Sequence, residues 1–183
     1  MLKKIVYGSI LRVQGLKPGI KSLMLIVLFI FIHGCGYQLV GEKGIYGGEI
    51  KSVYVPVFKN MTYEPHASVY LTDAFTRQLM ATGLFAVNKN NSDTYIEGVL
   101  KNIRIVPNAL DKNGIVIEKS VLIGVEISLF KKDGNLLKKW SFSDNQTYRV
   151  DDLGAEDFNK KEALSMVSDR IARRFCASIM TEY

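Results

Sequence analysis

Residues 113–148 read NGIVIEKSVLIGVEISLFKKDGNLLKKWSFSDNQTY, and this stretch decides the fold. It contains Asn113-Gly114 and Asp133-Gly134, two dipeptides that favour tight hairpin turns because both central residues of such turns take a positive φ. Between the turns, Ile115–Phe130 is one long run rich in β-branched residues. Two tight turns in succession predict three strands that pair as an antiparallel meander.

The first and last strands of this meander are predicted on either side of the run. The first strand is predicted over Thr94–Val106, where side chains alternate between two faces and Tyr95, Val99, Ile103 and Ile105 share one of them. The last strand is predicted over Leu136–Tyr148. Thirteen residues at about 3.3 Å each span roughly 43 Å, more than twice the common strand length. We expect such strands to project beyond the part of the sheet that helices cover.

A first helix is predicted before the meander. It should start near Ala67 or Ser68 and end at Gly83, where glycine would supply a left-handed cap. Its apolar positions fall at helical spacing: Leu71, Ala74, Phe75 and Leu79. The opposite side is polar and is expected to face solvent: Thr72, Asp73, Thr76 and Arg77.

A second helix is predicted after the meander. Asp151 or Asp152 offers an N-terminal cap, and the acidic Glu156 and Asp157 suit the positive end of the helix dipole. Apolar residues then recur at helical spacing through the C-terminal segment: Leu164, Val167, Ile171, Phe175 and Ile179.

One further strand is predicted before the first helix, over Lys51–Phe58. Pro56 cannot donate to a strand ladder, so this strand is expected at a sheet edge or with a bulge. The element order β-α-β-β-β-α predicts an α+β fold: a four-stranded, mainly antiparallel sheet with two helices packed on one face.

The N-terminal segment has the layout of a secretory signal, with five basic residues ahead of ten apolar residues, Leu23–Ile32. Ten helical residues cover about 15 Å, half of a hydrocarbon core, so a membrane span is not expected. Ile32-His33-Gly34-Cys35 resembles the bacterial lipobox, which implies diacylglycerol on the sulfur of Cys35, cleavage before it, and a third acyl chain. An ordinary secretory signal and a core helix are the alternatives.

This interpretation divides the chain into three parts. Residues 1–34 are a lipoprotein signal peptide that is removed, residues 35–48 are a lipidated, glycine-rich tether, and residues 49–183 form a single α+β domain. Five of the 24 basic residues and none of the 18 acidic residues precede Cys35, so the formal charge of +6 falls to +1. A nucleic-acid partner is therefore not expected, because no basic field remains to release counterions.

Patterns for catalysis and metal binding are absent. His66 is the one histidine after the signal and has no second histidine at metal-binding spacing, and Cys176 falls in a helical pattern that suggests a small buried hydrophobe. The G-x-S-x-G, P-loop and G-x-G-x-x-G patterns do not occur. No cofactor, no metal and no enzymatic activity are predicted, and the sequence favours a role in binding or scaffolding.

Taken together, the motifs resemble the LptE family of lipopolysaccharide-assembly lipoproteins. The resemblance rests on the element order and on these segments: Cys35-Gly36-Tyr37-Gln38-Leu39, Val55-Pro56-Val57-Phe58 with Asn60 and Thr62, Glu64-Pro65, and Leu71-Thr72. It implies a non-enzymatic protein that sits inside a large outer-membrane β-barrel of the LptD type, supports assembly of that barrel and binds lipopolysaccharide. Gly36 directly after the cysteine is consistent with anchoring in the outer membrane, facing the periplasm and the barrel lumen.

The resemblance also assigns candidate contacts with lipopolysaccharide, whose phosphates call for basic side chains. A basic residue before the first hairpin turn carries over to Lys112, and a second family position falls near Arg149 without mapping cleanly. The other hairpin tip carries the densest basic cluster, Lys131 and Lys132 with Lys138 and Lys139. Lysines at such tips also serve solubility, and this alternative stands beside the ligand interpretation.

Two other functional classes remain open from the residues alone. The chain could be a free envelope lipoprotein that acts as a scaffold without a barrel partner. It could also be a lipid-processing hydrolase, in which case His66, Asp73 or Asp144 would be needed for turnover.

Overall fold

The computed structural model describes residues 50–87, 91–150 and 154–181. The predicted signal peptide (residues 1–34), the acylated Cys35 and the tether (residues 35–48) lie outside the described residues. The predicted cap at Asp151 or Asp152 lies outside them as well.

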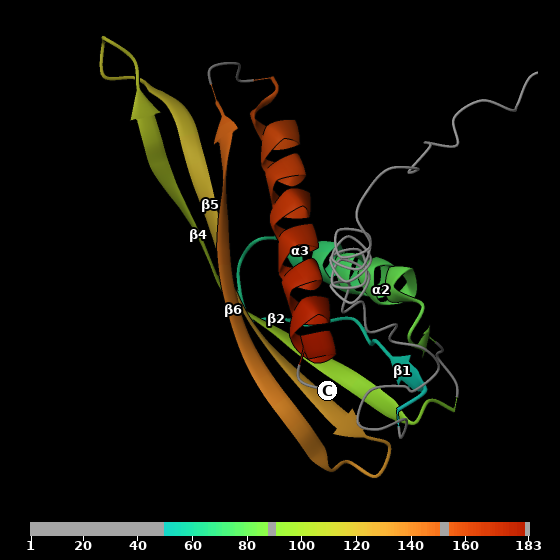
Figure 1. Cartoon of the computed structure of the whole chain (residues 1–183). Coiled ribbons are helices and arrows are strands. Elements are labelled where there is room, and N and C mark those ends of the chain that lie inside the picture. Colours follow the sequence, from blue (N-terminus) through green and yellow to red (C-terminus); the bar gives the residue numbers. More distant parts are fainter. Residues whose placement is uncertain (1–49, 88–90, 151–153, 182–183) are drawn as a thin grey trace, which may run out of the picture. The chain divides into compact units, whose positions relative to one another are not determined.

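The described residues form an α+β fold whose sheet is mixed (Figure 1). Its six strands are β1 (Ser52–Tyr54), β2 (Lys59–Asn60), β3 (Ala86–Val87), β4 (Thr94–Leu110), β5 (Val116–Lys131) and β6 (Leu136–Arg149). The strand order is β3-β1-β4-β5-β6, and β2 pairs with β4 beyond β1. β4, β5 and β6 form the predicted antiparallel meander, whereas β1 pairs in parallel with β3 and β4, and β2 with β4.

The prediction of a four-stranded sheet is wrong for two physical reasons. The run Lys51–Phe58 does not form one strand: β1 ends at Tyr54, Pro56 lies in the connection, and the chain rejoins the sheet as β2 at Lys59. Proline lacks the N–H that a continuous ladder needs, so the strand ends before it. β1 is also not an edge strand, because β3 covers its other side. β3 has only two residues, too few to give a periodic pattern.

Both hairpin turns occur where the sequence predicts them, but with a different geometry. Only the glycines take a positive φ, 81° at Gly114 and 88° at Gly134. In the first turn, Gly114 N–H donates to Asp111 O at 3.0 Å, and Asp111 N–H donates to Ile115 O at 2.8 Å. This pattern fits a three-residue loop in which glycine alone occupies the left-handed region. A positive φ at both central residues was therefore a wrong expectation.

The sequence predicts Tyr95, Val99, Ile103 and Ile105 on one face of β4, and the structure divides them between the two faces. The buried positions are Ile96, Gly98 and Leu100, whereas Tyr95 and Val99 are half-buried on the opposite face. A bulge at Lys101 then shifts the register between Leu100 and Asn102. The extra residue reverses which positions point toward the helices, and a strict period of two cannot reveal such a shift.

The two helices, α2 (Ala67–Thr82) and α3 (Glu156–Thr181), pack on each other and on one face of the sheet (Figure 1). Gly83 caps α2 with φ 65°, as predicted. All apolar residues predicted to line the core from the helices are buried: Leu71, Ala74, Phe75, Leu79, Leu164, Val167, Ile171, Phe175 and Ile179. Neither helix is long and apolar enough to span a bilayer, a statement that covers the described residues alone.

Thr72 is the exception on α2, because it is buried rather than solvated. Only 8 % of its surface is exposed. Its hydroxyl accepts from the N–H of Phe58 at 2.9 Å and donates to the carbonyl of Ser68 at 2.7 Å. The side chain satisfies a buried N–H of the segment that leads into β2, and so ties this segment to α2.

Phe58 lies at the centre of the core. Its ring rests on the backbone of Gly98 in β4, where an added Cβ would lie 2.2 Å from Phe58 Cδ2. The ring centroid is 4.9 Å from that of Phe75, which lies 5.0 Å from Phe175, and Phe175 lies 5.2 Å from Trp140. This series of rings connects β4, α2, α3 and β6 through aromatic contacts at favourable separations.

We predict that Gly98→Ala destabilises the fold by about 1–3 kcal/mol, because the new methyl group overlaps the buried Phe58 ring. Gly124→Ala is the matched control on β5. There the nearest atoms, at 2.9 Å, belong to the exposed amide of Asn102, which can rotate away. Urea unfolding of the two variants measures the difference. Equal stability of both variants would show that Phe58 does not depend on the glycine.

Candidate ligand-binding surfaces

The tip between β4 and β5 presents Lys112 on an ordered loop. The Asp111 carboxylate accepts the N–H groups of Asn113 and Ile115, each at 2.8 Å. These bonds, that from Ile115 first, hold the pKa of Asp111 below its ordinary value. Lys112 is exposed and forms no ion pair within the described residues. Exposed Leu110 and Ile115 flank it, so the tip combines a cation with apolar surface.

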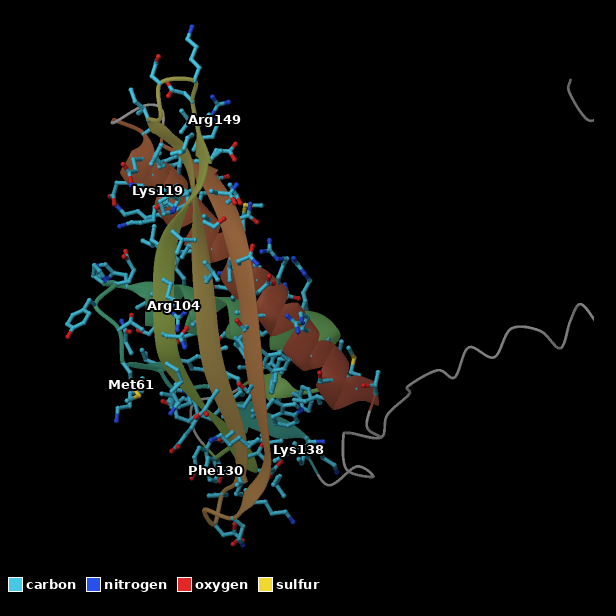
Figure 2. The ribbon with its side chains drawn as sticks, turned by 90° about the vertical axis from the view of Figure 1, so that its left-hand side faces the viewer. Met61, Arg104, Lys119, Phe130, Lys138 and Arg149 are labelled. Carbon is cyan, nitrogen blue, oxygen red and sulfur yellow. The ribbon has the colours of Figure 1, made fainter. Side chains whose placement is uncertain are left out.

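Arg149 lies at the end of the sheet where β4 turns into β5 (Figure 2), which is also the end that carries Lys112. It is the last residue of β6 and pairs in register with Glu118, close to the start of β5. Its carbonyl accepts from the side-chain amide of Asn159 in α3 at 3.0 Å. The two positions that the family resemblance indicated are thus brought to one end of the meander.

Lys131 and Lys132 lie at the opposite end. β5 runs from Val116 to Lys131, and its 16 residues separate the two tips by about 50 Å. Lys132 is held by two hydrogen bonds to the loop before β4. Its Nζ donates to Asn91 Oδ1 at 2.8 Å, and its N–H donates to Asp93 O at 2.9 Å. The four predicted residues therefore form two separate surfaces, and no single ligand head group reaches both.

The remaining lysines of this basic cluster face opposite sides of the sheet. Lys138 Nζ lies 5.6 Å from the centroid of the Trp140 ring on the helix side. Lys139 pairs with Glu126 at 3.1 Å on the open side, where Lys101 also reaches Glu126, at 3.0 Å. Side-chain hydrogen bonds from Lys101 and Lys139 hold the pKa of Glu126 below its ordinary value. Ordinary alternation places Lys101 on the same face as Val99, and the triad was missed because the sequence does not show which residues of β5 and β6 lie beside it.

On the helix side, Arg170 joins α3 to β6. Its Nε donates to Asp144 Oδ2 at 3.0 Å, a second nitrogen donates to Gln146 Oε1 at 2.7 Å, and a third to the backbone carbonyl of Asn145. Burial is the largest single influence on Asp144 and opposes its ionisation, but the hydrogen bonds from Arg170 and from the N–H of Asn145, with the charges of Arg170 and Arg174, together outweigh burial and lower the pKa. The carboxylate is therefore held as a structural anion, a role that competes with general acid–base chemistry.

The other candidates for hydrolysis are not brought together. His66 is exposed at the N-terminal cap of α2, and Asp73 lies about 10 Å along the same helix. Cys176 is buried, and burial raises the pKa of its thiol to about 11, so it is protonated at neutral pH. Among the described residues, no group of histidine, cysteine and acidic side chains could hold a metal ion.

An open groove of about 400 Å³ lies beside β4, and no sequence motif indicates it. One wall is the loop after β2, residues 61–64, and the other is β4 from Lys101 to Ile105. The groove forms where β2 ends and the loop turns away from the sheet, so it follows from strand length rather than from a motif.

Solved structures of low sequence identity share this arrangement of strands and helices. A minor lipoprotein from Acinetobacter baumannii is 13% identical, with 73% of this chain and 93% of that chain covered and a TM-score of 0.50. A protein from Xanthomonas campestris is 12% identical, with 72% and 87% covered and a TM-score of 0.51. At these identities the similarity is one of fold, which places the chain in a class with a mixed sheet and two helices on one face.

The family follows from the sequence itself. The model of the lipopolysaccharide-assembly family, LptE, matches residues 50–182. This chain therefore belongs to the LptE family, and the resemblance inferred from its segments and element order is confirmed. Among curated proteins, no relative matches.

Proposed function

We propose that the protein is a non-enzymatic lipoprotein of the outer membrane that sits inside a large β-barrel of the LptD type. There it assists assembly of the barrel and binds lipopolysaccharide on its way to the outer leaflet. The observation that carries this proposal is the family match, which spans all the described residues. Membership supports the general role in lipopolysaccharide assembly, and the barrel, the location and the ligand contacts are the steps proposed here.

The two faces of the sheet support a position in a water-filled lumen. The helix face of β5 is fully apolar over Val121, Ile123, Val125, Ile127 and Leu129. The open face of the same strand carries Glu126 with its two lysines, and β6 adds the serines at 141 and 143. An antiparallel sheet with one buried and one wetted face fits a barrel interior, which is polar.

The ligand contact is proposed for the Lys112 tip. Lipid A offers phosphates beside acyl chains, and this tip offers an ammonium beside exposed Leu110 and Ile115. Arg149 lies at the same end and is proposed as a second contact. Lys131 and Lys132, about 50 Å away, are proposed as a separate contact surface rather than as part of this one.

We predict that the protein co-purifies with a large β-barrel. A C-terminally tagged chain extracted gently from native membranes should recover a large β-barrel in near-equal amount, identified by mass spectrometry. Recovery of the lipidated chain without a barrel would instead support a free scaffold and refute the proposed position.

We predict that Cys35→Ser abolishes acylation and releases the protein from the membrane. Three acyl chains supply stable anchoring because each buried methylene adds about 0.8 kcal/mol. Palmitate labelling and membrane fractionation measure both effects. Continued palmitate incorporation in the variant would place the lipid elsewhere or refute the lipobox.

We predict that Lys112→Glu weakens lipopolysaccharide binding roughly three- to tenfold without changing the melting temperature, because Lys112 is exposed and charge reversal repels phosphate. Lys59→Glu makes the same change of charge at an exposed position in β2 and should bind normally. Equal affinities of the two variants would remove Lys112 from the contact surface.

A further inference from the structure

The edge of β4 is only partly covered. β1 pairs with it at Thr94 and Tyr95, and β2 pairs with it at Val99 and Leu100. The last contact on this side is the hydrogen bond from Met61 N–H to Leu100 O at 3.0 Å. β4 continues to Leu110, and among the described residues no strand pairs with this edge after Leu100.

The orientation of the free edge follows from the register. Val150 N–H donates to Ile117 O, so the backbone N–H and C=O groups of odd-numbered residues of β5 point toward β6. Ile103 and Ile105 pair with Ile123 and Val121, two of these odd-numbered residues. The N–H and C=O groups of Ile103 and Ile105 therefore point away from β5, into the free edge. Leu100, opposite Val125, points the same way, which agrees with its bond to Met61.

Pro107 pairs with Lys119, another odd-numbered residue of β5, so its backbone also points away from β5. It has no N–H, so the edge offers two donors, at Ile103 and Ile105, before it ends. This length suits a short extended segment rather than unlimited pairing with another sheet.

The loop opposite this edge is held in one shape by hydrogen bonds. Asn60 Oδ1 accepts from the N–H and the hydroxyl of Thr62, at 2.9 and 2.8 Å, and Asn60 Nδ2 donates to Glu64 O at 2.9 Å. The Glu64 carboxylate pairs with Lys160 of α3 at 3.1 Å, and both side chains are largely buried. The loop is thus fixed to the helix layer on one side and to β2 on the other.

This ordered loop displays two large apolar side chains in solvent. Tyr63 is fully exposed, and Met61 is 57% exposed beside β4 (Figure 2). Across the groove, Ile105 is 40% exposed. Aromatic and methionine side chains are enriched at the centre of protein interfaces, and the hydrogen bonds that fix this loop lower the cost of ordering its backbone on binding.

We propose that this groove binds an extended segment of the barrel polypeptide, which adds a strand to the free edge of β4 and packs under Tyr63 and Met61. The proposal rests on the barrel partner proposed above. A backbone segment can satisfy the N–H and C=O groups of Ile103 and Ile105, whereas an acyl chain would bury them unpaired. The bound segment would pair with β4 on the same edge as β2, beyond Leu100, and it would use about five residues.

The test compares two positions on opposite edges of the sheet in the full-length, membrane-extracted protein. Ile105→Pro removes one edge N–H, and Ile105→Ala removes the same side chain but keeps the N–H. Ser141→Pro is the control on β6: Ser141 pairs with Glu126 and so also faces away from β5. The readout is the amount of barrel recovered with each variant relative to wild type, alongside the melting temperature.

We expect Ile105→Pro to lower barrel recovery at least fivefold relative to Ile105→Ala, which lacks the same groove side chain but keeps the N–H, and we expect Ser141→Pro to be close to wild type. Equal recovery with Ile105→Pro and Ile105→Ala would overturn the proposal. So would an equal loss with Ser141→Pro.

A photo-crosslinking residue in place of Tyr63 gives a second measurement that does not depend on the folding of Ile105→Pro. We expect an adduct with an extended segment of the barrel, located by mass spectrometry. Barrel recovery without a barrel adduct, or adducts with lipid alone, would overturn the edge-strand proposal and leave the barrel partner intact. Absence of the barrel from the wild-type preparation would overturn both.

Discussion

The contact between Phe58 and Gly98 is the constraint on which the rest of the structure depends. Only a residue without a side chain lets the ring reach the backbone of β4, and the ring then meets Phe75 of α2. Thr72 fixes the same residue through its N–H. The N-terminal segment, the first helix and the sheet are therefore joined at one point, and α3 is added through the contact of Phe75 with Phe175.

This arrangement determines what the helices leave uncovered. α2 and α3 meet the sheet around the aromatic series, whereas β4 and β5 extend past it to the Lys112 tip. Strand residues buried at the centre give way to exposed Val106 and Leu110 toward that end. The hairpin therefore projects because β4 and β5 are longer than the part of the sheet that the helices cover. Its apolar and basic surface is available to a ligand or a partner.

Much of the fold could be predicted from the sequence, because the hairpin dipeptides, the Gly83 cap and the apolar spacing of both helices each have a local cause. The failures have causes that are not local. Whether Tyr95 or Ile96 is buried depends on which face of the sheet the helices cover. The bulge at Lys101 depends on the pairing of β4 with β5. The separation of Lys112 from Lys131 follows directly from strand length, and the opposite faces of Lys138 and Lys139 follow from the alternation of consecutive strand residues.

The groove beside β4 shows how a short strand can create a binding surface. β2 has two residues, so it covers β4 only at Val99 and Leu100, and the hydrogen bonds of Asn60 then turn the chain away from the sheet. A longer β2 would have covered the edge with the protein's own backbone. Because the loop leaves early and is fixed by the Glu64–Lys160 pair, Tyr63 and Met61 lie beside backbone groups of β4 that no strand of the described residues pairs. Apolar side chains and directional hydrogen bonds at one place favour an extended polypeptide over a lipid.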